Sequence, residues 1–482
     1  MNTDQQWMDL ENRSSEWRDL EFRNEIGLDV DPSEIEGLAQ SVTALAEAMT
    51  PSYRNDPDAW SLLSNILVEA QLTPTRLEIQ KLSEQHFTFE DILLDGQPVT
   101  PYSRARYLYQ ENDPQKRHDV LSRVANGHPA VDQVLERHNA KRRELAAEWD
   151  YTPLDDVLLA EGLHLDQLRK LLTEIATAMC SAFESCFAEN REAVLGSNQG
   201  EPWEDFVTLY MNRWSAYADR FIPTIDAVTA VRRVVRTMGF EIDAISMDLE
   251  DRPRKAPGAS AYGVRIPDDV RICVKPVGGV EDLLAIYHEM GHALHFVSID
   301  PNLPYFIRFG FSSGITETFS FWMESLISDP IYLKELGLSE RASAELIRFE
   351  QLERATFSTW LSVQALCIID YWTKGPFTLE GIGERLSHYM KQFMGLSVPV
   401  NAIRVTGTIA RTLDFNTVGY PIAYARLGHL LNQVEAKQCD WWNSPLGVDI
   451  VREYMRGGRK AGFPSSLLDI GPFIQRYAGN SS

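Results

Sequence analysis

Residues 287–295 read YHEMGHALH and contain a pattern with a specific chemistry. His288, Glu289 and His292 form an H-E-x-x-H motif. On a helix, residues four apart lie on one face, so both imidazoles can bind the same metal ion. Zn²⁺ takes imidazole and carboxylate ligands and keeps one position open for water, whose proton Glu289 can accept as a catalytic base. The motif therefore predicts one zinc ion and a hydrolase.

Chance explains this motif poorly. With 10 histidines and 69 acidic residues among 482, accidental matches are expected on the order of 0.03 times per chain. The alternative is a pair of surface histidines on one helix face. A helix is favoured, because Glu281 and Asp282 supply acids where it would begin. Gly291 costs about 1 kcal/mol relative to alanine inside a helix, which indicates that another segment packs closely against this turn.

A third ligand is expected from a second helix downstream. Residues 314–324 read GITETFSFWME, and Thr316 can cap this helix at its start. Glu317, Ser320 and Glu324 then fall on one face. Glu317 can complete a His₂Glu site, and Glu324 can accept a hydrogen bond from a ligand imidazole. Ser320 is a candidate for the same supporting layer.

Alternatives stay open for several of these groups. Glu317 taken alone could be a solvated helix acid, but a buried position is favoured by its apolar neighbours, Phe319, Phe321, Trp322 and Met323. His295, on the turn after the motif, is expected to be a packed or substrate-side histidine rather than a ligand. Zinc is the expected metal, although a His₂Glu set also accepts Co²⁺ or Mn²⁺.

The rest of the chain predicts a mostly helical fold in three parts. Residues 1–30 are polar and indicate a partly disordered segment, residues 31–245 a helical N-terminal lobe, and residues 246–482 the catalytic lobe. A helix is expected to begin at Asp31-Pro32-Ser33. Amphipathic stretches follow at about 74–85, 129–148, 165–188 and 202–220. Breaks are expected between some of them, at 73–75, 127–129 and 196–202.

The clearest strand signal lies just before the H-E-x-x-H motif. Residues 260–266 and 270–274 are β-rich and flank Pro267-Asp268-Asp269. Two such runs around a turn predict a hairpin.

Composition limits the partners and the location. There are 46 basic and 69 acidic residues, and the resulting net charge of -23 disfavours nucleic acid as a partner. Five cysteines without a C-x-x-C pair argue against a disulfide framework and a cysteine metal site. The N-terminus lacks secretory features and no run approaches 18 apolar residues, so we expect no membrane association and a cytoplasmic location. The oligomeric state stays open.

The motifs resemble those of the thimet oligopeptidase and oligoendopeptidase F family of zinc peptidases. In that family H-E-x-G-H-x-x-H is followed, 25 residues after its second metal-binding histidine, by the glutamate of E-x-x-S-x-x-x-E. His292 and Glu317 have this separation here. Segments 248–259 and 419–425 are also similar, and the resemblance covers about 248–475. Angiotensin-converting-enzyme-like peptidases share H-E-M-G-H, but the spacing here is closer to the oligopeptidases.

The resemblance implies a zinc endopeptidase with two helical lobes around a deep channel that admits short peptides. The hairpin would carry an edge strand to which a substrate adds by β-augmentation. The substrate-binding residues would be Ala259, Ala261, Tyr262 and Gly263, together with His295 and Tyr424. Tyr420 would be catalytic and Tyr424 a second donor to the developing oxyanion, the alternative for both tyrosines being a buried aromatic stripe.

The chain departs from the family at two positions. The family histidine before the Gly-Tyr segment is absent from Asp414-Phe415-Asn416, and a second family tyrosine would fall at Leu427. His388 or His429 could replace the histidine, although a structural role is expected for each. These departures leave open a specialised peptidase that removes a leader or tailors one peptide. A non-catalytic, zinc-containing peptide-binding protein is a further alternative, against which the presence of Glu289 argues.

Overall fold

The computed structural model describes residues 3–210, 218–406 and 415–478, most of which are helical. The helices before the motif are α1 (Thr3–Glu25), α2 (Pro32–Tyr53), α3 (Pro57–His86), α4 (Arg104–Gln110), α5 (Pro114–Asn126), α6 (Pro129–Glu148), α7 (Pro153–Glu161), α8 (Leu165–Asn190), α9 (Pro202–Thr208) and α11 (Ala227–Thr237). The later helices are α12 (Gly279–Ser298), α13 (Tyr305–Phe309), α14 (Ser313–Glu324), α15 (Pro330–Glu335), α16 (Glu340–Lys374), α17 (Leu379–Met394), α19 (Gly419–Lys437), α20 (Asp449–Arg456) and α21 (Gly471–Tyr477). The predicted mostly helical class is confirmed.

Several helices of the N-terminal half begin where a proline follows a capping residue. The side chain of Asp31 accepts a hydrogen bond from the Ser33 amide, so the predicted start of α2 is confirmed. The predicted break at 127–129 is also confirmed, between α5 and α6. The break at 73–75 is wrong, because α3 continues through Pro74. Burial of side chains in the preceding turns, including Leu72, keeps this helix together despite one lost backbone hydrogen bond.

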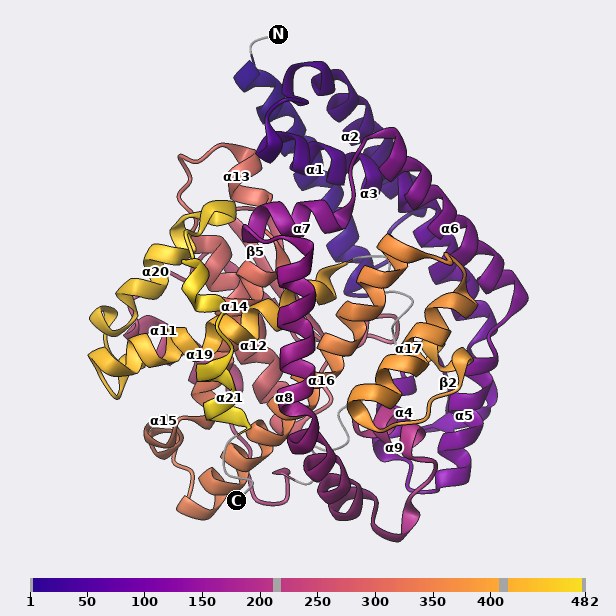
Figure 1. Ribbon diagram of the computed structural model, residues 1–482, viewed down its shortest axis with the longest axis vertical. Helices are drawn as coiled ribbons and strands as arrows, with labels where there is room; N and C mark the ends of the chain where they lie inside the picture. The colour runs from indigo at the N-terminus through magenta and orange to yellow at the C-terminus, as the bar shows by residue number, and fades with distance from the viewer. Residues whose placement is uncertain (1–2, 211–217, 407–414, 479–482) are drawn as a thin grey trace.

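The polar N-terminal segment forms helix α1 and is not partly disordered over residues 3–25. It buries Leu10, Trp17 and Leu20 against α2 and α3, at the top of Figure 1. Phe22 instead packs in a small cluster with side chains of the β-sheet. Tertiary contacts of a few apolar residues therefore order a segment whose overall composition is polar.

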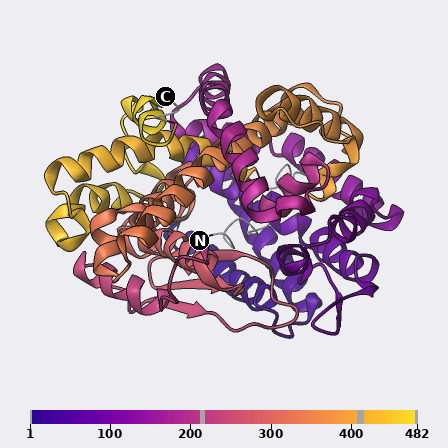
Figure 2. The same ribbon diagram turned by 90° about the horizontal axis from the view of Figure 1, so that it is seen from below.

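A three-stranded sheet precedes α12 and lies at the lower left of Figure 2. Its strands are β3 (Ile245–Asp248), β4 (Ala259–Arg265) and β5 (Asp269–Val274), in the order β3-β5-β4. β4 and β5 are antiparallel, which confirms the predicted hairpin, and β3 adds a parallel strand that was not predicted. Helix α12 packs against both β4 and β5, so the sheet beside the motif helix is confirmed.

A second, unpredicted hairpin interrupts the helices of the N-terminal half. Strands β1 (Phe89–Leu94) and β2 (Gln97–Val99) pair through a turn at Asp95-Gly96. Both turn residues have positive φ, 53° and 78°. Asp-Gly favours this turn, because glycine reaches positive φ without strain and aspartate tolerates it.

The largest buried cluster of the described residues extends across the predicted boundary at residue 245. Helix α8 packs along α16 near the centre of the molecule (Figure 1), and the largest buried cluster contains residues from both predicted lobes. The division into lobes at this position therefore stays a prediction. By length and composition alone, Leu165–Asn198 could cross a membrane, but 44% of its apolar window is buried inside the protein.

The expectation that another segment packs against Gly291 is confirmed. A Cβ at this position would lie 2.5 Å from Cα of Ser320 on α14. We predict that Gly291→Ala lowers the free energy of unfolding by about 1–3 kcal/mol, although alanine favours a helix, because the two helices would have to separate. Gly37→Ala on α2, where nothing lies within 4 Å, should instead raise it by about 0.5–1 kcal/mol. Urea denaturation measures both, and a higher free energy of unfolding for Gly291→Ala would contradict the close contact.

Candidate metal centre

Helices α12 and α14 bring His288, His292 and Glu317 together. One potential ligand atom from each residue lies within 4.8 Å of the other two. Nε2 of His288 is 3.3 Å from Oε2 of Glu317, and Nε2 of His292 is 3.5 Å from Oε1. Bonds of about 2.0–2.1 Å in a tetrahedral zinc site put ligand atoms about 3.3 Å apart. The spacing therefore suits one zinc ion.

Hydrogen bonds orient the two imidazoles. Nδ1 of His288 lies 2.8 Å from Oε2 of Glu324, the contact that the helical spacing predicts. Nδ1 of His292 lies 2.8 Å from Oγ1 of Thr316. When Nδ1 donates to these oxygens, each Nε2 carries the lone pair that faces Glu317. Oε2 of Glu317 is buried without a hydrogen-bond partner within the described chain, and a bound cation would satisfy it.

The charges of the metal-free site favour metal binding. Burial lowers the pKa of His292 to about 4, which keeps this imidazole neutral. Burial raises the pKa of Glu317, but the neighbouring histidines and a hydrogen bond from Tyr420 outweigh it, so the pKa is lowered overall. Burial likewise lowers the pKa of His288, but the neighbouring carboxylates of Glu317 and Glu324 outweigh it and raise the pKa well above its usual value. Zinc would replace the proton that these carboxylates hold on His288.

Glu289 adjoins the ligands on α12 and is buried, with 6% of its surface exposed. Burial raises the pKa of its carboxyl to about 7. A base works best when its pKa lies near the working pH. This carboxyl is therefore suited to accept and return a proton near neutrality.

The start of α19 brings Tyr420 to the metal ligands. A Cβ on Gly419 would lie 2.7 Å from the carbonyl carbon of Ser313, so the absence of a side chain lets α19 approach the start of α14. Tyr420 is half-buried and hydrogen-bonds to Glu317. Its hydroxyl is thereby held beside the candidate metal centre.

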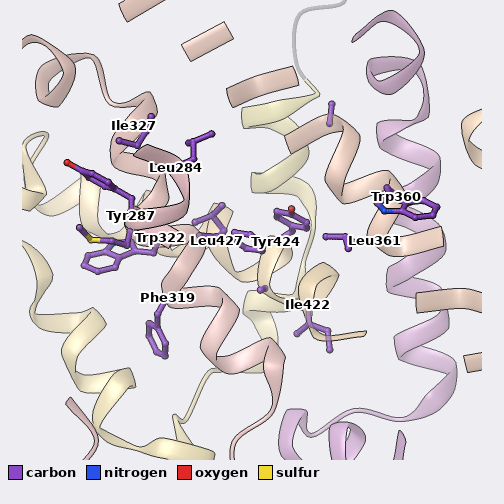
Figure 3. Close-up of a cluster of buried hydrophobic side chains, with 14 of the residues drawn as sticks. Leu284, Tyr287, Phe319, Trp322, Ile327, Trp360, Leu361, Ile422, Tyr424 and Leu427 are labelled. Atoms are coloured by element: carbon purple, nitrogen blue, oxygen red, sulfur yellow. The ribbon is translucent and has the colours of Figure 1, made fainter. Parts of the chain in front are cut away.

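Tyr424 does not face a substrate, which corrects the expected role. It is 1% exposed, and its ring stacks on that of Phe321 with centroids 4.3 Å apart. Figure 3 shows it in the buried cluster together with Leu427, which is fully buried. The buried aromatic alternative therefore holds for Tyr424. The position of the missing family tyrosine faces the core.

His295 is a packed histidine, so the first of its two expected roles holds and the substrate-side role does not. It is fully buried, with ring centroids 4.7 Å from Phe319 and 4.9 Å from Phe311. Burial lowers its pKa to about 3, so the ring is neutral.

Strand β4 exposes alternate backbone groups at the edge of the sheet. The amide of Lys275 donates to the carbonyl of Gly258, which makes these residues a hydrogen-bonded pair. The antiparallel alternation then directs the N–H and C=O groups of Ala259, Ala261 and Gly263 away from β5. These three residues have the geometry that a β-augmenting peptide requires.

Tyr262 differs from its neighbours on β4, which corrects the substrate contact expected of it. The register pairs its backbone with Arg271 of β5. Its hydroxyl donates to Glu25 of α1, and its ring packs edge-on against Phe22. Both its backbone and its side chain are therefore already engaged within the protein.

Two expectations for α14 are wrong. The cap is Ser312 rather than Thr316, because α14 begins one turn earlier and the Ser312 hydroxyl accepts from the Ile315 amide. Thr316 instead bonds His292. The Ser320 hydroxyl donates to the Thr316 carbonyl at 3.4 Å rather than to a ligand imidazole. Its small side chain instead allows the approach of Gly291.

Arg354 of α16 is a supporting residue that sequence reasoning missed. It is 2% exposed, and its Nη2 donates to Oε1 of Glu324 at 2.6 Å. Its Nε donates to Oε1 of Glu350 at 2.9 Å. The guanidinium thus fixes the carboxylate that orients His288. The Glu350–Arg354 spacing is visible in the sequence, but nothing in it indicates the contact with Glu324.

We predict that Arg354→Met weakens zinc binding roughly 10- to 100-fold, as expected when an outer partner of a metal ligand is lost. Zinc affinity measured by competition with a chelator tests this, and Arg354→Lys should retain part of the affinity. Arg348→Met, at an exposed position of the same helix, is the matched control. Unchanged zinc affinity in folded Arg354→Met protein would contradict the orienting role.

The remaining candidates lie apart from the ligand group. Asp414 is outside the described residues, and Phe415 is buried. His388 is exposed on α17. Nε2 of His429 hydrogen-bonds to the carbonyl of Asp469 at 2.9 Å. Neither histidine belongs to the group that could hold a metal ion.

Comparison with known proteins identifies the fold. No family model and no curated protein matches the sequence. Among solved structures, PZ peptidase A with inhibitor 2 has a TM-score of 0.64 at 12% identity, covering 94% of this chain and 83% of that one. BsuCP has a TM-score of 0.59 at 13% identity, and the match covers 98% of this chain and 97% of that one. An M32 carboxypeptidase from Deinococcus radiodurans R1 has a TM-score of 0.52 at 15% identity, and the match covers 98% of this chain and 96% of that one. The chain therefore has a fold found in peptidases, and the resemblance to the thimet oligopeptidase family depends on the motifs alone.

Proposed function

We propose that this protein is a zinc-dependent peptidase whose metal is held by His288, His292 and Glu317. The observation that carries the proposal is the approach of these three side chains to within 4.8 Å, with Glu289 beside them. A purely structural zinc site needs no buried acid next to its ligands. The fold shared with PZ peptidase A and an M32 carboxypeptidase supports the same reaction class.

Zinc at this site would polarise the scissile carbonyl and make the attacking water more acidic. Glu289 takes the proton from that water and passes it to the leaving amine. The Tyr420 hydroxyl, which donates to Glu317 in the metal-free site, would instead donate to the oxygen that gains negative charge. Thr316 and Glu324 keep the two imidazoles oriented throughout.

An extended peptide would bind by adding to the free edge of β4. Ala259, Ala261 and Gly263 offer backbone donors and acceptors there. Beyond them, the guanidinium of Arg18 donates to the Val264 carbonyl at 3.0 Å, which ends the free edge. Backbone recognition of this kind tolerates many side chains and suits short, unfolded peptides within a channel. Endopeptidase action in the cytoplasm, the expectation from the sequence, is part of this proposal.

Zinc analysis combined with peptide cleavage tests the proposal. Purified protein should contain about one zinc per chain and should cleave a mixed library of short peptides. A chelator should remove both metal and activity, and added zinc should restore them. Cleavage of a single peptide would favour the specialised processing enzyme, whereas bound zinc without any cleavage would favour the peptide-binding alternative.

A further inference from the structure

A cavity of about 560 Å³ lies at the end of β4 where that strand begins. One wall comes from the β1–β2 hairpin and the start of α4, and the other from residues 251–258 and 275–277. Gly258, the residue before β4, lines it. Much of the lining is apolar, including Leu94, Pro98, Pro253, Pro257, Pro276 and Val277. Through Gly258, the cavity therefore directly adjoins the strand edge to which a peptide would add.

Lys275 and Arg106 are the two cations that line this cavity. The Lys275 ammonium donates to the carbonyls of Lys255 and Arg252 at 3.0 and 3.3 Å, and it has no carboxylate partner within the described chain. Burial lowers its pKa, so a carboxylate would compensate for water that the ammonium has lost. The acids at the cavity, Asp95 and Asp251, both lie near Arg106, at 3.2 and 3.8 Å. The charge of Asp251 also acts on Lys275 and raises its pKa, but burial outweighs this effect.

We propose that this cavity binds the free C-terminal carboxylate of a peptide that lies antiparallel to β4. A peptide antiparallel to β4 runs toward Gly258 and enters the cavity with its C-terminus. A peptide in the opposite direction would bring its ammonium terminus to Lys275 and be repelled. The ammonium thus selects one binding direction and one kind of chain end.

The position of the cavity along α12 limits the length of the released fragment. The backbone amide of Val277, at the cavity, donates to Asp282 in the first turns of α12 at 2.8 Å. Along the axis of this helix, His288 lies about 14 Å from the first residue. At the other end of β4, a Cβ on Gly263 would lie 3.6 Å from Phe296, beyond the motif. The metal ligands are therefore level with the middle of β4. At about 3.3 Å per residue, at most about four residues separate the cleaved bond from the carboxylate.

This inference rests on the proposed function, and it narrows the substrates to peptides with a free C-terminus. Two quenched fluorescent peptides of one sequence, a free acid and its amide, test it without any variant. The zinc-loaded enzyme should cleave the acid with a kcat/KM roughly 10- to 100-fold higher, as expected for a hydrogen-bonded charge pair. Mass spectrometry should find the cleavage at most about four residues from the C-terminus, and the cleavage site should move with that end when residues are appended.

Variants of Lys275 assign the preference to this cavity. Lys275→Met should lower cleavage of the acid to the level of the amide, and Lys275→Arg should retain the preference. Lys170→Met, where the side chain is 75% exposed on α8, is the matched control. Equal cleavage of acid and amide by the wild type, or a preference that persists in folded Lys275→Met protein, would overturn the proposal.

Absence of any cleavage would count against the peptidase function. The carboxylate site in the cavity can then be tested separately by binding. Fluorescence anisotropy then measures binding of the same two peptides to the zinc-loaded protein. Tighter binding of the acid that is lost in Lys275→Met supports the carboxylate site. Equal binding of acid and amide overturns it.

Discussion

Glu289→Gln is expected to lose peptide hydrolysis and keep zinc. Glutamine has nearly the shape of glutamate but cannot accept the proton of the attacking water. Glu289 is not among the three grouped ligands, so the metal should stay bound. General base catalysis contributes roughly 10²- to 10⁴-fold, and kcat should fall by that factor. Steady-state cleavage of a fluorescent peptide and zinc analysis of the same sample measure both properties.

A matched variant separates this effect from a general loss of acidic charge. Glu136→Gln removes a carboxylate from an exposed position on α6 and should leave cleavage unchanged. Full activity of Glu289→Gln would exclude the assigned role. Loss of zinc from Glu289→Gln would instead indicate that the carboxylate supports the metal rather than the proton transfer.

The approach of the candidate ligands could be predicted because it depends on short-range helix geometry. His288 and His292 share a face by their four-residue spacing, and Glu317 and Glu324 share another by theirs. Only one tertiary contact, between α12 and α14, had to be assumed. Gly291 already indicated that contact, since its helix cost implied a close neighbour.

Residues that act through long-range packing could not be predicted. Arg354 reaches Glu324 from α16, and no local pattern relates the two positions. Tyr424 and His295 each lie on a helix that also carries a candidate catalytic or ligand residue, so a role at the site was a reasonable expectation. Their burial depends on which aromatic side chains of other elements surround them.

The strands likewise differ in whether a local sequence pattern or a long-range contact determines them. The β4–β5 hairpin followed from two β-rich runs around a turn. The β1–β2 hairpin carried an Asp95-Gly96 signal that the surrounding helical texture obscured. β3 is four residues long and pairs with a strand more than twenty residues away, which no local pattern reveals.

Glu317→Gln should reduce zinc affinity by more than the 10- to 100-fold expected from loss of an outer partner. The change removes the only negative charge among the three grouped ligands, and an amide oxygen is a much weaker partner for the cation. Zinc should be lost on dialysis, and hydrolysis with it. Competition with a chelator measures the affinity, and denaturation of the metal-free proteins checks that the variant is folded.

Glu324→Gln is the control that makes this result specific, because it is an equally buried glutamate on the same helix, seven residues away. Its carboxylate contacts His288 through Nδ1, so its loss should weaken zinc binding only 10- to 100-fold. We therefore expect Glu317→Gln to lose more zinc affinity than Glu324→Gln, because Glu317 contacts the cation directly and Glu324 acts on it through His288. A reversed order would mean that Glu324 rather than Glu317 supplies the third ligand, and equal small effects would remove the carboxylate from the metal site altogether.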